Sequence, residues 1–108
     1  MSARLPSDLL VAAMLRRVQQ AGGYATVLAK GDAQAGSVLV IGVERGADPH
    51  IWERGSGPDG SIVLIDSTPP GDVDEYWRRR RARDPDLWVI ELDVPNSERF
   101  AAETMLDD

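Results

Sequence analysis

The 108-residue sequence contains no cysteine, one histidine and one lysine. The absence of cysteine excludes disulfides, thiolate metal ligands and cysteine nucleophiles, and it is typical of proteins in a reducing compartment. No stretch approaches the ~18 consecutive apolar residues of a membrane span. Residues 1–6 also lack the basic and apolar run of a secretory leader. We therefore expect a cytoplasmic protein with no membrane, metal or cofactor partner.

The length and the 43% hydrophobic content are sufficient for one core, so we expect a single domain over residues 1–108. Residues 1–6 and 96–108 are expected to be flexible or weakly helical ends. The formal net charge is −6. This charge repels phosphate backbones and argues against general nucleic-acid binding, although a local basic patch can override it.

Two segments carry apolar residues at helical spacing. In residues 7–21, apolar positions recur every three or four residues after Ser7, which we expect to be the N-cap, and Gly22 ends the pattern. The segment from Asp72 to Glu75 resembles a capping box, the motif in which two side chains cap the start of a helix. It predicts a second helix that runs to about residue 83. The sequence therefore predicts two main helices.

Five short runs rich in β-branched and aromatic residues are separated by glycine, proline and aspartate, which indicates strands. These runs are residues 24–30, 37–44, 49–54, 61–66 and 87–94. The segment 37–43 is apolar on both faces and is expected in the centre of the sheet, whereas 49–54 alternates and carries charge, as an edge strand does. The last run is expected to be half-buried.

The first four predicted strands follow one another directly, which is typical of an antiparallel meander. With one helix before them and one after, the pattern predicts the α+β class, in the order α-β-β-β-β-α-β. We expect an antiparallel sheet of about five strands with the two main helices on one face.

The second predicted helix contains a dense run of basic residues. It comprises Arg78, Arg79, Arg80, Arg81 and Arg83. Five acidic residues flank the run, so residues 72–86 have no net charge. Asp74 with Arg78 and Glu75 with Arg79 have the favourable i,i+4 order, which predicts salt bridges along a solvated helix.

The same run has a second interpretation as an anion site, because guanidinium groups suit phosphates and carboxylates. The site would consist of Arg78, Arg79, Arg80 and Arg83, with Lys30 if it lies close. Binding of a nucleotide, phosphate or RNA at such a site should weaken steeply with salt.

Two further features are weaker indications of chemistry. Residues 30–36 contain two glycines but no Gly-Lys-Ser/Thr, and a strand follows, so we predict a hairpin connector with positive φ at glycine rather than a P-loop. His50 has no metal-ligand or triad partner near it in sequence, which favours a surface or strand-packing histidine.

A hydrolase built on Asp32 or Asp66 with His50 is the weakest hypothesis, because a nucleophile, a base and an orienting group cannot all be named. The large aromatic residues are expected in the core rather than around a ligand. They are Trp52, Trp77 and Trp88.

Three segments resemble the DUF1491 family of small alphaproteobacterial proteins. They are Leu-Arg-Arg at 15–17 with Ala-Gly-Gly at 21–23, Lys-Gly-Asp-Ala-Gln-Ala-Gly-Ser-Val-Leu-Val at 30–40, and Arg-Asp-Pro-Asp-Leu-Trp-Val-Ile-Glu at 83–91. The resemblance covers about residues 7–93 and departs from the family pattern at about 48–71. Because the family has no known function, the resemblance implies a lineage and a compact fold but no activity or ligand.

These observations favour a non-enzymatic binding or protein-interaction module. Its expected contact surfaces are the arginine-rich helix and an exposed strand edge at 49–54, through which two copies could pair as a homodimer. The partner is either an unknown protein or a second copy of the chain. The anion-binding interpretation remains the alternative.

Overall fold

The computed structural model describes residues 5–106, which form three helices and five strands. In chain order these are α1 (Ser7–Gln20), β1 (Tyr24–Ala29), β2 (Val38–Glu44), β3 (Ala47–Ser56), β4 (Ile62–Asp66), α2 (Val73–Arg83), β5 (Trp88–Asp93) and α3 (Ser97–Leu106). The predicted elements agree closely with these bounds, and α3 is a full helix where a weakly helical end was expected. The expectations for residues 1–4 and 107–108 lie outside the described part of the chain.

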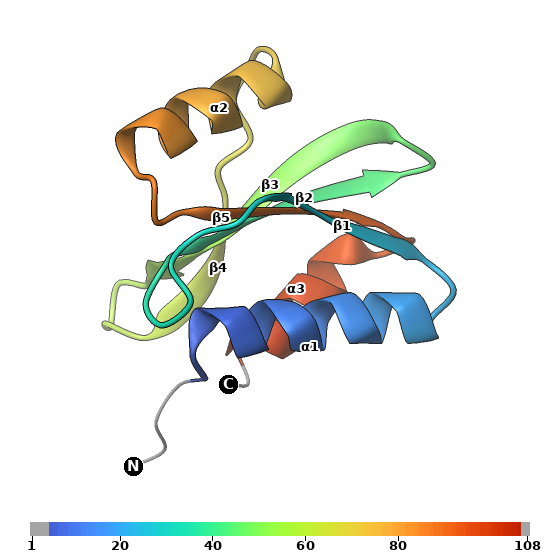
Figure 1. The fold of residues 1–108 in the computed structure, drawn as a ribbon, viewed down its shortest axis with the longest axis horizontal. Coiled ribbons are helices and arrows are strands. Elements are labelled where there is room, and N and C mark those ends of the chain that lie inside the picture. Colours follow the sequence, from blue (N-terminus) through green and yellow to red (C-terminus); the bar gives the residue numbers. More distant parts are fainter. Residues whose placement is uncertain (1–4, 107–108) are drawn as a thin grey trace.

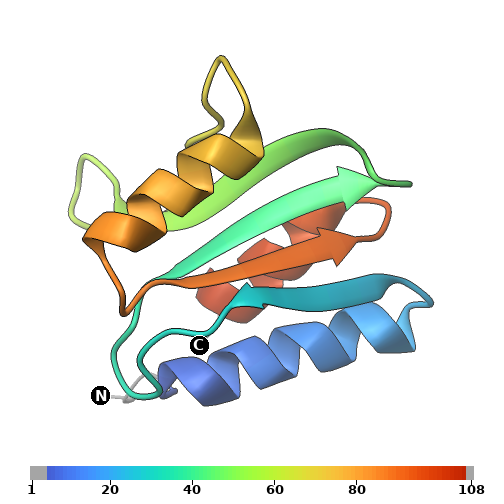
Figure 2. The ribbon, with the colours of Figure 1, turned by 45° about the horizontal axis from the view of Figure 1, so that its top comes forward.

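The five strands form one sheet in the order β1-β5-β2-β3-β4 (Figure 2). The α+β class and the mostly antiparallel sheet are confirmed. The structure differs from the expected meander because β5 lies between β1 and β2, antiparallel to β1 and parallel to β2. Val89, Ile90 and Leu92 of β5 are fully buried. A strand that is apolar on both faces is more stable in the centre of a sheet than at its edge.

The prediction that residues 49–54 form an edge strand is wrong. They belong to β3, which pairs with β2 on one side and β4 on the other, so the edges are β1 and β4. Glu53 is one of the charged residues that suggested an edge, and its carboxylate forms an ion pair with Arg80 of α2. A charged side chain on this strand therefore reflects an ion pair above the sheet rather than an exposed edge.

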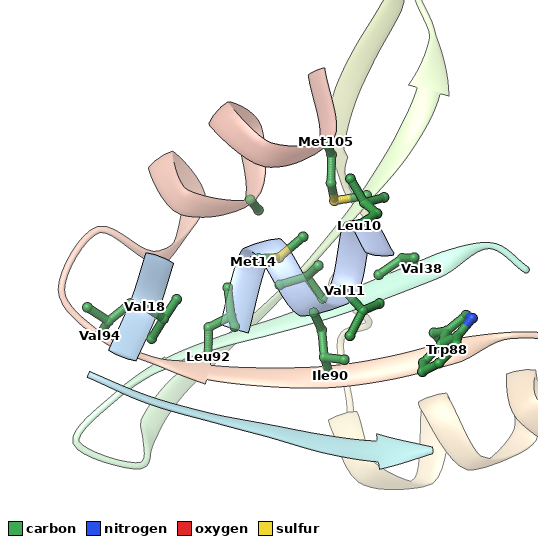
Figure 3. Close-up of a cluster of buried hydrophobic side chains, with 12 residues drawn as sticks. Leu10, Val11, Met14, Val18, Val38, Trp88, Ile90, Leu92, Val94 and Met105 are labelled. Atoms are coloured by element: carbon green, nitrogen blue, oxygen red, sulfur yellow. The ribbon is translucent and has the colours of Figure 1, made fainter. Parts of the chain in front are cut away.

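The helices cover both faces of the sheet, whereas one face was expected (Figure 1). α1 and α3 pack together on one face, where Met14, Leu10 and Met105 meet Ile90 and Leu92 in the first core cluster (Figure 3). α2 lies on the other face, and its buried residues belong to a second cluster with Leu39, Ile41 and Val89. Because β2 and β5 are apolar on both faces, each face needs a helix to exclude water.

The loop at residues 30–36 joins three parts of the fold. The Ser7 hydroxyl donates to the carbonyl of Gly36 at 2.6 Å instead of capping α1. The Asp32 amide donates to the Asp86 carbonyl at 3.0 Å, and the Trp88 indole donates to the Asp32 carbonyl at 2.7 Å. The loop therefore fixes the start of α1 against the segment that leads into β5.

The prediction of a hairpin connector with positive φ at glycine is also wrong for residues 30–36. Its two strands are separated by β5, and positive φ occurs elsewhere among the described glycines, at Gly22, Gly46 and Gly60. Gly36 is needed for close approach, because a Cβ there would lie 2.1 Å from the carbonyl oxygen of Asp86. The resemblance to a hairpin arose from spacing alone.

We predict that Gly36→Ala destabilises the protein by about 1–3 kcal/mol, since the contacting atoms belong to the backbone and cannot rotate away. Gly71→Ala is the matched control, because a Cβ at Gly71 meets no atom within 4 Å. Urea denaturation of both variants measures the difference. Equal stability of the two variants would show that the loop does not pack against Asp86 as described.

Candidate functional site

The arginine-rich helix α2 begins as the sequence predicts. The Asp72 side chain caps it by accepting a hydrogen bond from the Glu75 amide at 3.1 Å. Val73 and Trp77 are the buried residues of the helix, and they face the sheet. The arginines are consequently distributed around the sides and the outer face of α2.

Arg80 is committed to an ion pair with β3. Its two terminal nitrogens donate to both oxygens of Glu53, at 2.7 and 3.0 Å, and one of them also contacts the Tyr76 hydroxyl at 3.0 Å. Burial by itself raises the pKa of Glu53, but hydrogen bonds from Arg80 and Ser67 outweigh burial and lower that pKa below its ordinary value. The hydrogen bond to Glu53 in turn raises the pKa of Arg80. This bidentate pair fixes α2 to the sheet.

The other basic residues of α2 do not join Arg80 in a single site. Arg81 donates to the backbone carbonyl of Lys30 at 2.8 Å, so Lys30 lies close to the helix but contributes an oxygen to this contact. The Arg78 guanidinium lies 5.1 Å from the ring centroid of Trp77. Arg79 and Arg83 are exposed. Arg78 and Arg79 line one hollow on α2, but three carboxylates, those of Asp72, Asp74 and Glu75, line it as well.

The salt bridges expected along α2 are not formed. Within residues 5–106, no ion pair joins Arg78 to Asp74 or Arg79 to Glu75. Asp74 accepts instead from the Trp77 indole at 3.2 Å. The flanking acidic residues balance the total charge of the arginine run. The ion pair that holds the helix, however, is formed by Arg80 with Glu53 of β3.

Arg80 lines a hollow of about 600 Å³ together with Arg54. Glu53 and Asp84 line the same hollow, and the Arg54 side chain donates to the Met105 carbonyl at 2.8 Å. Two guanidinium groups and two carboxylates leave no excess of positive charge. The charges around this hollow therefore do not favour an anion.

The three residues of the hydrolase hypothesis do not form one site, because His50 lies near Asp66 but Asp32 is elsewhere. The His50 ring nitrogen Nδ1 lies 3.6 Å from a carboxylate oxygen of Asp66. Asp32 is elsewhere, where its carboxylate accepts from the amides of Gln34 and Ala35. Among residues 5–106 no hydroxyl group is hydrogen-bonded to His50, and no group of three or more acidic or histidine side chains could hold a metal ion.

The free edge of β1 is the surface that the sequence did not reveal. β1 pairs with β5 on one side only, and its six residues, Tyr-Ala-Thr-Val-Leu-Ala, include no charge. The exposed fractions are 77% for Tyr24, 39% for Val27 and 36% for Leu28. An uncharged edge with exposed apolar side chains is a template for pairing with another strand. The sequence does show that this strand is uncharged. Only the position of β5 between β1 and β2, however, reveals that the strand lies at an edge of the sheet.

The other edge strand, β4, is also partly apolar. Ile62 and Ile65 are 41% and 40% exposed. This strand ends in Asp66, and its preceding turn holds Asp59, whose carboxylate accepts from the Ser61 hydroxyl. Carboxylates thus flank β4, whereas β1 itself is uncharged.

We predict that Glu53→Gln lowers the free energy of unfolding at neutral pH by about 1 kcal/mol, a modest value because the pair is only partly buried. The pKa of Glu53 is lowered by folding, so the pair stabilises fully above the ordinary value of about 4.3 and is lost as the pH falls through the folded-state value. Urea denaturation over this acid range should show a smaller pH dependence for the variant. Glu75→Gln, which changes an exposed residue of α2, is the control, and equal effects of the two changes would contradict the assignment.

None of the helices within residues 5–106 is long and apolar enough to cross a membrane. The arrangement of strands and helices matches solved structures along most of its length. A crystal structure of a DUF1491 family protein from Caulobacter crescentus CB15 is 36% identical, with a TM-score of 0.79, and the match covers 90% of this chain and 94% of that one. An NMR structure of a DUF1491 family protein from the same organism is 36% identical, with a TM-score of 0.75 and coverage of 92% and 94%.

A solution structure of a protein from A. tumefaciens is 27% identical, with a TM-score of 0.70 and coverage of 87% and 89%. No curated protein matches the chain. The model of a family described as "protein of unknown function (DUF1491)" matches residues 5–102. The chain therefore belongs to the DUF1491 family.

Proposed function

We propose that the chain is a non-enzymatic protein-interaction module and that two copies pair through the free edge of β1. The observation that carries this proposal is an edge strand with no charged residue and with Tyr24, Val27 and Leu28 exposed. Backbone amide and carbonyl groups on the outer side of such a strand can form a second ladder. Pairing would join the two sheets into one.

Symmetry and charge favour a second copy as the partner. Two β1 strands related by a two-fold axis run antiparallel, so one surface patch serves both subunits. The chain has a net charge of −6, which makes two copies repel each other at a distance. An uncharged strand lets the two copies approach with the least repulsion, and contact between the exposed apolar side chains then stabilises the pair.

The β4 edge is less suited to self-pairing. In an antiparallel pair of β4 strands, the end of one strand lies beside the start of the other. Asp66 of one copy would then approach the turn that holds Asp59 of the other copy, and like charges across a strand pair are destabilising. The proposal therefore assigns the contact to β1.

Val27→Lys is expected to weaken the dimer by at least about tenfold, because it places an ammonium group near the middle of β1 in both subunits. Ile65→Lys is the matched control, since Ile65 on β4 has nearly the same exposure. Sedimentation velocity over a dilution series measures the association of the wild-type chain and of both variants. Thermal unfolding verifies that both variants are folded.

A wild-type chain that stays monomeric at every concentration would overturn the proposed dimer. A dimer that survives Val27→Lys but dissociates with Ile65→Lys would instead assign the contact to β4. Either result contradicts the β1 edge as the contact surface.

Anion binding by α2 is a second proposal, supported by one observation. Arg79 and Arg83 are exposed and have no ion-pair partner within residues 5–106. Both can therefore contact a phosphate without first breaking a pair.

For this second function, Arg79→Ala combined with Arg83→Ala should abolish binding of a short labelled RNA at low ionic strength, measured by fluorescence anisotropy. Arg16→Ala with Arg17→Ala on α1 removes the same charge and serves as the control. No binding by the wild-type chain, or equal loss in both double variants, would count against an anion site on α2.

A further inference from the structure

Helix α1 lies along the β1 edge of the sheet. It contacts β1 and β5, whereas α3 contacts β2, β3 and β4 on the same face (Figure 1). The Arg17 guanidinium of α1 donates to the Glu103 carboxylate of α3 at 3.4 Å, so Arg17 marks the side of α1 that faces α3. The opposite side of α1 therefore faces outward, beyond the β1 edge.

Four residues lie on this outward side of α1. An α-helix turns by about 100° per residue, so Leu15, two positions from Arg17, points in nearly the opposite direction. Residues three or four positions from Leu15 share its side of the helix. The set, which we call the α1 seam, is Asp8, Ala12, Leu15 and Gln19. The alternation of steps of four and three residues is the spacing of the contact seam between two packed helices.

The middle of the α1 seam is apolar and its ends are polar. Ala12 is exposed, and Leu15 is half-buried, with one side packed against the first core cluster. Asp8 and Gln19 at the two ends are exposed. A carboxylate accepts hydrogen bonds and a glutamine amide donates them, so these two end residues are complementary to each other. The seam therefore suits a second copy of itself that runs in the opposite direction.

Pairing of two β1 strands would bring two copies of the α1 seam together. The two-fold axis of such a pair is perpendicular to the sheet, so both copies of α1 lie on the same face. Adjacent strands are about 4.8 Å apart, which places a helix centred above β1 and β5 about 5 Å from the axis. The second copy of α1 then lies about 10 Å away, and packed helices are about 8–10 Å apart. The strand pairing thus sets the two helices at packing distance.

The position of the axis along α1 matches the middle of the seam. α1 and β1 run in opposite directions and are joined by a short turn after Gln20 (Figure 2). The middle of β1 lies about 8 Å from its start, a distance that corresponds to about five or six residues of helix. Counted back from Gln20, this distance reaches the stretch between Ala12 and Leu15. In two antiparallel helices centred there, Ala12 of one copy faces Leu15 of the other, and Asp8 faces Gln19.

We propose that α1 forms a second layer of the interface, in which Ala12 and Leu15 pack against Leu15 and Ala12 of a second copy. The small side chain of Ala12 leaves room for the larger Leu15 of the partner copy. The Gln19 amide donates to the Asp8 carboxylate at each end of the contact. This proposal rests on the pairing of β1 strands and adds a helix contact that strand pairing alone does not require.

Cross-linking of single-cysteine variants tests the helix contact. The chain has no cysteine, so a thiol-specific reagent can join only the two introduced side chains. With the short cross-linker bis(maleimido)ethane, Leu15→Cys should give a covalent dimer on a denaturing gel. Arg16→Cys is the matched control, because Arg16 is exposed and adjacent to Leu15 but points away from the seam. This control should remain monomeric on the same gel.

Sedimentation velocity before cross-linking separates the two proposals. Each variant is cross-linked at a concentration at which it sediments as a dimer. A dimer in which Leu15→Cys is linked no better than Arg16→Cys would overturn the α1 contact and leave the pairing of β1 strands intact. A wild-type chain that is monomeric at every concentration would overturn both proposals.

Ala12→Glu gives a second measurement that needs no reactive thiol. It places a carboxylate against Leu15 of the partner copy in both subunits and should weaken the dimer by at least about tenfold. Gln20→Glu is the control, because it adds the same charge at an exposed position of α1 outside the seam. Thermal unfolding should show that both variants are folded, since both positions are exposed. Equal dimer dissociation constants for the two variants would contradict the α1 contact.

Discussion

The fold depends on the parallel pairing of β5 with β2. This pairing places Val89 opposite Leu39 and Ile90 opposite Val40, so that the two most apolar strands lie together in the middle of the sheet. Because β5 is inserted between β1 and β2, β1 keeps a neighbour on one side only. The chain between β4 and β5 carries α2 across the opposite face from α1 and α3 (Figure 1). The proposed contact edge and the position of α2 both follow from this one pairing.

The same pairing explains how the basic helix is held. α2 has few buried residues of its own, Val73 and Trp77, and its position is fixed by polar contacts at its sides. Arg80 pairs with Glu53 of β3, and Arg81 donates to the Lys30 carbonyl beside β1. The helix is thus attached on both sides of the central strands. The guanidinium groups that look most like a ligand site in the sequence are partly structural.

Much of the local structure could be predicted from the sequence. Helical spacing and the Asp72 cap identify the helices from contacts that are close in the chain, and the apolar run of β2 identifies a strand that is buried on both faces. The order of the strands could not be predicted, because Glu91 and Asp93 gave β5 the alternation of a half-buried strand. Glu91 is accommodated in the centre because it lies partly exposed near the start of α2, where burial and the charges of Asp74 and Asp93 raise its pKa.

The functional surfaces were harder to foresee for the same reason. An edge strand is defined by the neighbour that it lacks, so the importance of Tyr24 and Val27 emerges only with the strand order.

Residue-resolved amide hydrogen exchange at low and high protein concentration tests the central claim most directly. The account predicts that β5 amides are protected at both concentrations, and that β1 amides facing away from β5 become protected only when the concentration rises. The β4 amides should exchange at the same rate throughout. Rapid exchange along β5, or protection that grows along β4 while β1 stays unchanged, would contradict the strand order or the contact edge described for this protein.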